Sequence, residues 1–449
     1  IALQFIADKL QEAGMPGVAS LNMGSIGGPT DGTSTIARAM NDFVDLGNSL
    51  VCGVGDDGGA DNHASAAILQ GESIELNIQK SETGNLRFEL WYSEEDRFEV
   101  TLTRPDNSTE GPFVAPATAN DKDDRFLTGI NYYHRGANMD FAGATSNRRQ
   151  IMIDLSGTTG EYKISLTGTS IDGSGNFHAV LNPSRHGNNN KFLSHVVAGY
   201  AINDFASSEK SISPTDYVVK NDWIDMDGIQ RQMTGQGDPG ELWAGSSWGP
   251  TQDDRMGVNF AACGEVLYGA YSPNTWYSHF PHLLVQGGEN NYGIQNAVSA
   301  AAPLTAGVIA LMLDANPNLT PAMIKQILQQ TARSDGFTGN VPNNQWGYGK
   351  LDALNAVEEA EATGIFSRPA NQFNLKIYPN PSSDIIHLSI DEKLSGKVET
   401  IQVFNNLGQE VASYQNDISS ISVSHLSSGV YHVKVKTTSG SSYGKFLKK

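Results

Sequence analysis

A change in hydrophobic period near Gly71 limits, more than any other feature, how this chain can fold. From there to Asn182, apolar residues alternate with polar ones, as at Ile74, Leu76 and Ile78. This alternation is typical of strands that face water on one side. The flanking segments instead have apolar residues at helical spacing. The sequence therefore predicts an antiparallel β-sandwich inserted into an α/β domain.

The segment before the insert predicts a βαβ unit. Residues 1–14 and 34–47 have the spacing of helices, and residues 18–22 and 50–54 that of short buried strands. Two strands joined by a helix are expected to lie parallel, in a sheet with helices on both faces. The chain starts at Ile1, inside a helical pattern. We therefore expect it to be the C-terminal part of a longer protein.

The α/β pattern returns after the insert and ends with two helices, expected at residues 299–315 and 320–333. The second has Thr320 as its N-cap and Pro321 at its first helical position. Later alternating runs, separated by turns such as NNLG, are typical of a small all-β sandwich. The predicted segments are the α/β domain in two parts at 1–67 and 183–358, the insert at 68–182, a linker at 359–373 and the tail at 374–449.

Charge and composition exclude several classes of protein. The chain has 30 basic and 49 acidic residues, a formal charge of −19, whereas a nucleic-acid-binding surface requires the opposite sign. The apolar runs, such as residues 308–313, are much shorter than the roughly 20 residues of a membrane helix. Cys52 and Cys263 provide neither a disulfide framework nor metal-ligand spacing. We expect no nucleic-acid partner, no membrane span and no metal centre.

A serine followed by three alanines and a proline, residues 299–303, opens the predicted apolar helix. This places the Ser299 hydroxyl near a helix N-terminus, where amides and the helix dipole stabilise developing negative charge. An ordinary serine N-cap on a buried helix explains the same local pattern. On these residues alone, both interpretations stay open.

The wider context resembles the subtilisin-like serine proteases. AVSAAAPLTAGVIALM, from Ala297, resembles the family's GTSMAAPHVAGVVALL, which implies that Ser299 is the nucleophile. SLNMGSIGG resembles the family's NMSLGG strand, which pairs with the substrate backbone, and implies that role for Ser25, Ile26 and Gly27. The resemblance implies a subtilisin-like fold and hydrolysis of peptide bonds in polypeptide substrates, with no cofactor.

Two further stretches support this resemblance. SSWGPTQDDRMGVNFAACG, from Ser246, resembles the family's SSRGPTxDGRxKPDIVAPG, and WGYGKLDALNA, from Trp346, resembles its closing GxGxVDAxxA segment. GGPTDGTST, from Gly27, and GDDGGADNHAS, from Gly55, resemble the branch related to the clostridial spore-germination proteases. In that branch the insert is a jelly roll, so the resemblance implies a jelly-roll-like sandwich here.

Peptide hydrolysis in this family needs a histidine that takes the serine proton and an aspartate that orients the histidine. In the family both precede the NMSLGG strand, so we expect them upstream of Ile1. None of the histidines present lies in a segment like HGTHVAG, and we expect structural roles for them. They are His63, His134, His178, His186, His195, His279, His282, His387, His425 and His432.

Three positions depart from the family pattern. Ala297 replaces the glycine of GTS, which puts the local turn in doubt because glycine lets the backbone pass close to the substrate. Cys263 replaces the proline of APG, and we expect a buried packing residue. Asp56 replaces the oxyanion-hole asparagine of AAGN. This last change bears directly on activity, because an ionised carboxylate cannot donate a hydrogen bond.

The tail, from Tyr378, resembles the C-terminal sorting domain of the type IX secretion system of Bacteroidetes. IYPNPSSDIIHLSI, IQVFNNLGQEV and LSSGVYHVKVKTTSGSSYGKFLKK match its YPNP start, its hairpin and its GxY finish with a terminal lysine. A carbohydrate-binding or adhesive sandwich is the alternative, but we find no aromatic platform for one. The resemblance implies type IX machinery as a partner and a secreted or cell-surface location.

The acidic runs at residues 121–124 and 253–254 offer the oxygen ligands that Ca²⁺ prefers. Solvated loops explain them too, so a structural calcium cannot be assigned to particular residues.

The sequence as a whole predicts the nucleophile half of a secreted subtilisin-like serine endopeptidase with an inserted sandwich and a sorting tail. The alternative is a catalytically degenerate member that acts as a surface or scaffold protein, which Asp56 and Ala297 favour. A pure adhesin would explain the β-domains but not the stretches around Ser299 and Trp346.

Overall fold

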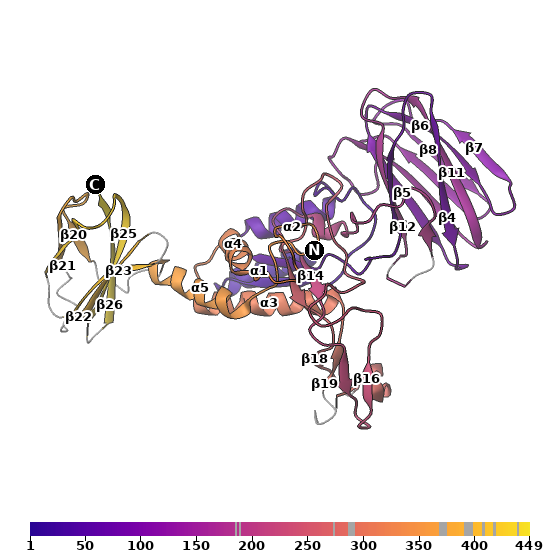
Figure 1. The fold of residues 1–449 in the computed structure, drawn as a ribbon. Coiled ribbons are helices and arrows are strands. Elements are labelled where there is room, and N and C mark those ends of the chain that lie inside the picture. The colour runs from indigo at the N-terminus through magenta and orange to yellow at the C-terminus, as the bar shows by residue number, and fades with distance from the viewer. Residues whose placement is uncertain are drawn as a thin grey trace. The chain divides into compact units, whose positions relative to one another are not determined.

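The computed structural model of the chain falls into two compact units. The first comprises Ile1–Ala310 with Thr320–Ala353, and the second Leu311–Leu319 with Leu354–Lys449. Figure 1 labels their helices and strands. The structure describes residues 1–184, 186–187, 190–272, 274–285, 292–367, 375–389, 398–405, 409–415, 419–437 and 440–449.

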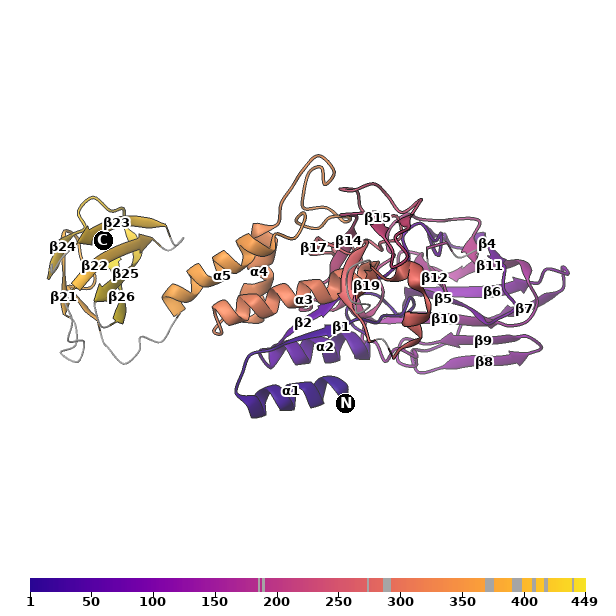
Figure 2. The same ribbon diagram turned by 90° about the horizontal axis from the view of Figure 1, so that it is seen from below.

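Short parallel strands form the centre of the first unit. Strand β1 (Val18–Leu21) pairs with β2 (Ser49–Cys52), and β14 (Pro214–Tyr217) pairs with β17 (Phe260–Cys263). A parallel bridge between Val51 and Ile212 joins the two pairs. Figure 2 shows helices α1 and α2 on one side of β1 and β2, and α3 on the other.

The helices of this unit lie close to their predicted positions. Thr320 accepts a hydrogen bond from the Met323 amide as the N-cap of α4, with Pro321 in the first turn, as predicted. On α2, Met40 and Phe43 face the strands and are buried. The bounds are α1 Ala2–Ala13, α2 Thr35–Asp45, α3 Val298–Ala315 and α4 Pro321–Thr331.

The alternating segment forms most of two packed antiparallel sheets, as its period of two predicts, and the flanking strands β3 and β13 complete them. The six-stranded sheet runs in the order β3 (His63–Ala67), β12 (Asn176–Asn182), β5 (Leu86–Ser93), β10 (Arg148–Leu155), β9 (Ile130–Arg135) and β8 (Lys122–Leu127). The five-stranded sheet runs β13 (Lys191–Phe192), β4 (Ser73–Lys80), β11 (Gly160–Ser170), β6 (Arg97–Thr103) and β7 (Thr109–Phe113). Their inward side chains form one core, with Phe88, Leu90, Phe98 and Phe177 fully buried.

The expectation of a parallel main sheet needs correction, because the largest sheets of the chain are antiparallel. Each parallel strand has four residues, whereas β11 of the sandwich has 11. The sandwich strands are longer because the alternation of apolar and polar residues continues over longer stretches before each turn. Among the named strands of the described residues, parallel pairing is confined to the layer between the helices.

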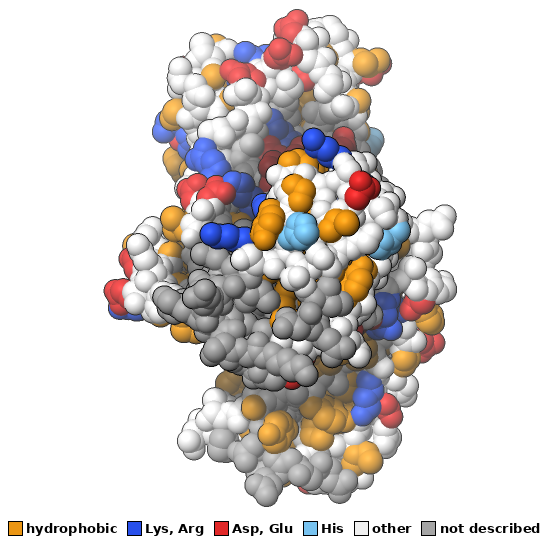
Figure 3. All heavy atoms as spheres, turned by 90° about the vertical axis from the view of Figure 1, so that its left-hand side faces the viewer, with side chains coloured by type: hydrophobic (Ala, Val, Ile, Leu, Met, Phe, Trp, Pro, Cys, Tyr) orange, Lys and Arg blue, Asp and Glu red, His pale blue; other side chains and the backbone are white. Residues whose placement is uncertain are grey.

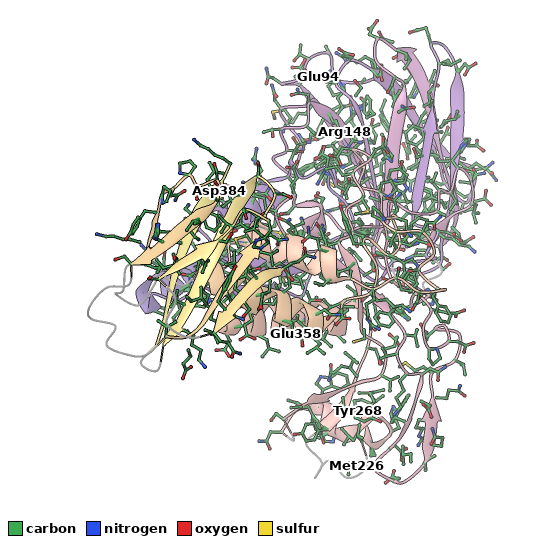
Figure 4. All side chains as sticks on the ribbon, turned by 60° about the vertical axis from the view of Figure 1, so that its left-hand side comes forward. Glu94, Arg148, Met226, Tyr268, Glu358 and Asp384 are labelled. Carbon is green, nitrogen blue, oxygen red and sulfur yellow. The ribbon has the colours of Figure 1, made fainter. Side chains whose placement is uncertain are left out.

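A small arm of the first unit was not predicted. It has its own small core of Trp223, Val266 and Ile294, and Figure 4 labels Met226 and Tyr268 within it. Its elements are β15 (Asp222–Ile224), β16 (Gln230–Gln232), β18 (Leu267–Ala270), β19 (Tyr292–Gln295), η2 (Trp276–His279) and η3 (Pro281–Leu283). A further short helix, η1 (Phe205–Ser207), lies in the segment before β14.

The second unit ends in an all-β region, as predicted. Its sheets have the orders β20-β21-β24 and β23-β22-β25-β26, around a core that includes Ile386, Ile401, Val433 and Phe446. On the described surface, Figure 3 shows orange apolar side chains among charged and polar ones. The strands are β20 Lys376–Tyr378, β21 Ile385–Ser389, β22 Val398–Asn405, β23 Glu410–Gln415, β24 Ser420–Ser422, β25 Gly429–Thr437 and β26 Gly440–Lys448.

Helix α5 (Ala353–Ser367) occupies part of the stretch that was predicted to be a linker. Its run of Ala and Glu residues favours helix over coil. The rest of that linker, residues 368–373, and residues 406–408 of the NNLG turn lie outside the described residues.

One helix in the described part of the chain, Val298–Ala315, is long and apolar enough to cross a membrane by length and composition. The sequence analysis predicted this apolar helix, but not as a membrane span, because its longest uninterrupted apolar runs are short. Of this helix, 56% is buried inside the structure, as expected of a core helix.

Candidate active site around Ser299

Ser299 lies on a pocket of about 270 Å³ that five separate chain segments form. Ser25, Ile26 and Asp56, three of the other predicted site residues, line the same pocket. Gly27 does not line it but lines a neighbouring pocket of about 430 Å³, which Ser25 and Ile26 share. The fold thus brings the predicted residues to one region of the first unit.

Ser299 is the second residue of α3 and is exposed. Its carbonyl accepts a hydrogen bond from Asn22 Nδ2 at 2.9 Å, and among the described residues its hydroxyl has no hydrogen-bond partner. An exposed hydroxyl at the start of a helix meets the positive end of the helix dipole. This side chain is free to contact a molecule in the pocket.

The turn into α3 adopts the conformation that the family's glycine would favour. Ala297, at that position, has a positive φ of 70°, which costs a residue with a Cβ about 1 kcal/mol. Its amide donates to Glu265 Oε1 at 2.9 Å. The turn is therefore kept with alanine, at the cost of backbone strain.

Asp56 lies directly against the start of α3. Its Oδ1 accepts a hydrogen bond from the Val298 amide at 3.2 Å, next to the predicted nucleophile. Burial raises the pKa of Asp56, and the Val298 hydrogen bond opposes this shift. The side chain acts as a hydrogen-bond acceptor here, whereas an oxyanion requires a donor.

Three more carboxyl groups, which the sequence analysis missed, surround the start of α3. Burial raises the pKa of Asp57 to about 7, helped by the charge of Asp56. Burial likewise raises the pKa of Glu265 to about 7, against the hydrogen bond from the Ala297 amide. Two features of the sequence could have indicated these groups. Glu265 directly follows Gly264, and Asp216 lies inside a buried strand.

That strand residue, Asp216, is fully buried. Neither of its carboxyl oxygens has a hydrogen-bond partner among the described residues. Burial raises its pKa well above the usual value, as do the charges of Glu265 and Asp56, and the Gly264 backbone offsets this only in part. Burial next to the start of α3 therefore disfavours the ionised form of Asp216.

The segment 25–28, called the substrate segment below, contributes Ser25 and Ile26 to the lining of this pocket and Gly27 and Gly28 to that of the neighbouring one. The Ser25 carbonyl accepts from the Asp204 amide at 3.0 Å. The Ile26 carbonyl accepts from Asn182 Nδ2 at 2.9 Å. This segment is thus held from two directions, by the α/β part and by the end of β12.

No histidine is among the residues that line the pocket. His134 in the sandwich core binds the hydroxyls of Tyr92 and Tyr132, and burial lowers its pKa to about 3. His63 stacks on His178, and burial also lowers its pKa to about 3. Burial disfavours the charged form of these rings, and none of them lines the pocket, so they are not candidate bases for Ser299.

Within the described ranges, no group of three or more His, Cys, Asp or Glu residues is arranged to hold a metal ion. In the acidic runs that sequence offered as calcium ligands, Asp123 and Asp124 pair with arginines. Asp253 pairs with Arg255, and Asp254 accepts from the Tyr200 hydroxyl. Protein partners therefore occupy these carboxylates.

Comparison with known proteins identifies two regions of the chain. The profile of the subtilase family matches residues 114–349, and that of the secretion system C-terminal sorting domain matches residues 376–449. The chain is 28% identical over 162 residues to the serine protease AprX of Bacillus subtilis (strain 168), which covers 36% of this chain and 35% of AprX. It is 36% identical over 92 residues to Furin-1 of Xenopus laevis, which covers 18% of this chain and 12% of that protein. The chain spans about a third or less of the length of these relatives.

Among solved structures, the chain is similar to the CspB protease of Clostridium perfringens. The TM-score is 0.61 at 18% sequence identity, over 80% of this chain and 70% of that protease. At this identity the similarity establishes the fold alone. It is a mixed fold of sheets and helices followed by an all-β region.

Proposed function

The chain belongs to the subtilase family, and we propose that it forms the nucleophile half of a secreted serine endopeptidase in which Ser299 attacks the peptide carbonyl. The observation that carries this proposal is the position of Ser299. It is exposed at the start of a buried apolar helix, on a pocket that Ser25 and Ile26 of the substrate segment also line. A peptide lying along that segment would bring its carbonyl carbon to the Ser299 hydroxyl.

The attack requires a base, because a serine hydroxyl is a weak nucleophile until its proton is removed. No pocket-lining residue of this chain is a histidine. We propose that the histidine and aspartate of a Ser-His-Asp triad precede Ile1, in the family's order. The histidine would take the Ser299 proton, and then return it to the leaving amine of the cleaved peptide.

The tetrahedral intermediate carries a negative charge that must be stabilised by donors. The Ser299 amide at the start of α3 is the donor that the backbone offers, and Asp56 occupies the place of the second. A protonated Asp56 could donate a hydrogen bond, and its raised pKa favours that form. Asp56 thus decides how active the site is.

A second candidate function follows from Asp56 itself. Its carboxylate accepts the Val298 amide, which suits a stabilised helix start rather than an oxyanion hole. With four carboxyl groups around the helix start, a catalytically degenerate member would bind polypeptides without cleaving them. The same experiment separates the two functions.

The tail matches a secretion system C-terminal sorting domain, which marks proteins that type IX secretion releases or places on the cell surface. We propose that the type IX machinery engages residues 374–449 and that residues 359–373 connect this region to the rest. We further propose residues 68–182 as a jelly-roll insert between the two subtilase parts, 1–67 and 183–358. The sheet orders β3-β12-β5-β10 and β4-β11-β6-β7 support this, because they are those of two interlocked Greek keys, with β3, directly before residue 68, as the first strand.

The test uses the full-length protein, including whatever precedes Ile1. A fluorophosphonate probe should label one serine, and Ser299→Ala should abolish both labelling and peptide hydrolysis. Stability should change little, because a small exposed side chain is replaced by a smaller one. Labelling that persists in the variant would remove Ser299 from the mechanism, and a protein that binds peptides without labelling would support the degenerate function.

Deletion of the tail from Tyr378 tests the sorting role. The second unit has its own core, so the truncated protein should keep peptidase activity in the cell extract and disappear from the medium and cell surface of a Bacteroidetes host. Cell fractionation with an immunoblot measures this. A truncated protein that is still exported would contradict the role of the tail.

A further inference from the structure

Two side chains of the inserted sandwich bind the backbone of the substrate segment. Glu89, on β5, accepts a hydrogen bond from the Gly28 amide at 2.8 Å. Asn182, at the end of the neighbouring strand β12, donates to the Ile26 carbonyl at 2.9 Å. The contacts join residues that are 61 and 156 positions apart in the chain.

A third contact comes from β10, on the other side of β5. Arg148 Nη1 donates to the Pro29 carbonyl at 3.0 Å, and its guanidinium lies 3.8 Å from Asp31 in the same loop. Figure 4 labels Arg148 in the sandwich. Three adjacent strands of one sheet therefore contact the same short stretch of backbone.

The Glu89 carboxylate is itself fixed by buried groups of the sandwich. Its Oε1 also accepts from Trp91 Nε1 and from Gln150 Nε2, each at 2.8 Å. Trp91 is fully buried, and Gln150 is 1% exposed. A charged acceptor makes stronger hydrogen bonds than a neutral one, so the Gly28 amide is held by a group that cannot easily move.

The segment passes so close to Glu89 that only glycine fits. A Cβ on Gly27 would lie 2.6 Å from Glu89 Oε2, and Gly27 has a φ of 109°. On the opposite side, a Cβ on Gly28 would lie 2.7 Å from Asp204 Cγ, whose carboxylate accepts from the Thr30 amide. The segment is confined between a carboxylate of the insert and one of the α/β part.

From these contacts we infer that Glu89 is a positioning residue, through which the inserted sandwich sets the place of the substrate segment relative to Ser299. The inference rests on the proposed function, in which that segment binds the peptide backbone. The insert is then part of the binding apparatus, although its strands lie apart from the nucleophile. It acts on substrate binding and leaves the chemistry at Ser299 unchanged.

Backbone hydrogen exchange tests the contact without any need for activity. In Glu89→Ala, amides of residues 25–30 should exchange at least about tenfold faster, because opening of the segment is no longer opposed by a charged acceptor. Glu75→Ala is the matched control: it makes the same change on β4 of the same sandwich, where Glu75 pairs with Lys163 on the surface. Exchange of residues 25–30 that is equal in both variants would overturn the inference.

Kinetics of the full-length enzyme test the consequence. With a peptide long enough to cover the segment, Glu89→Ala should raise KM about tenfold with kcat within about threefold, and a substrate too short to reach the segment should be affected less. Glu89→Gln, which retains an acceptor oxygen, should recover most of the loss. An equal fall in kcat on both substrates would indicate a general structural role and overturn the inference.

If Glu89→Ala fails to fold, Asn182→Ala replaces it. This variant removes the contact to the Ile26 carbonyl from a partly exposed side chain, and it should give the same pattern more weakly. If the wild-type enzyme hydrolyses no peptide, the proposed function fails while hydrogen exchange still decides whether Glu89 positions the segment.

Discussion

The two sides of the pocket are both held by carboxyl groups, but in opposite ways. On the substrate side, one oxygen of Glu89 accepts from three donors, Gly28, Trp91 and Gln150. On the nucleophile side, Asp56 and Glu265 each accept from one backbone amide. A carboxylate with many donors is stable when buried, whereas one with few donors favours its protonated form. The difference indicates a rigid substrate side and a nucleophile side that responds to protons.

Among the substitutions that test this comparison, Asp56→Asn should have the largest effect, which is on turnover. The amide can still accept from Val298 through its oxygen, while its nitrogen can donate to the oxyanion. Loss of one such donor typically costs about 10² to 10³ in kcat, and two unit charges about 4 Å apart repel by roughly 4 kcal/mol at an effective dielectric near 20. We expect turnover to rise by about 10- to 100-fold, most strongly at pH values above the raised pKa of Asp56, where its carboxyl group is ionised.

Paired pH–rate profiles on a peptide amide substrate measure this. Asp57→Asn is the control, since it removes the neighbouring charge from the same pocket. An equal gain in both variants would mean that charge removal, not a new donor, is responsible. A lower turnover of Asp56→Asn at every pH would show that the oxyanion assignment is wrong.

Asp216→Asn should stabilise the folded protein at neutral and higher pH. Because the pKa of Asp216 is raised in the folded state, the folded protein binds this proton more tightly than the unfolded chain does. Stability is therefore lost as the pH rises from about 4, the usual value, through the folded-state pKa. Removing the charge should recover about 1–3 kcal/mol, the range for an unsatisfied buried polar group.

Thermal unfolding of the wild type and Asp216→Asn at several pH values checks this sign. The two curves should nearly coincide near pH 4, and the variant should unfold at the higher temperature at pH 8. Glu89→Gln should not show this gain, because its carboxylate has donors. A pH-independent difference for Asp216→Asn would refute the link to ionisation.

Ala297→Gly should have the smallest effect and should act on the nucleophile side alone. Glycine adopts a φ of 70° without strain, so we expect a gain of about 0.5–1 kcal/mol. Denaturant unfolding of the variant measures it, with Ala300→Gly inside α3 as a control that should be destabilised instead. A loss of stability in Ala297→Gly would show that the turn is not strained.

The hydrophobic pattern by itself predicted the sandwich strands and the helices of the first unit, but neither its small arm nor helix α5. The period of two predicted the strands of the inserted sandwich, because alternate side chains of a half-exposed strand must be buried. Local capping chemistry predicted the start of α4 at Thr320 and Pro321. Motif resemblance identified the family, and it named Ser299 and Asp56, which the structure brings to one pocket.

Only the tertiary structure decided how that pocket is held. Asp56 and Val298 are 242 positions apart, and Glu89 and Gly28 are 61 apart, so no local pattern joins them. Whether a carboxyl group is satisfied or isolated depends on burial and on donors from other segments. In the sequence, Asp216 is simply an aspartate in a short strand, and only the fold shows that it is buried. The sequence thus determined which carboxyl groups are present. Packing determined the burial and the hydrogen-bond donors that favour or disfavour the charged form of each one.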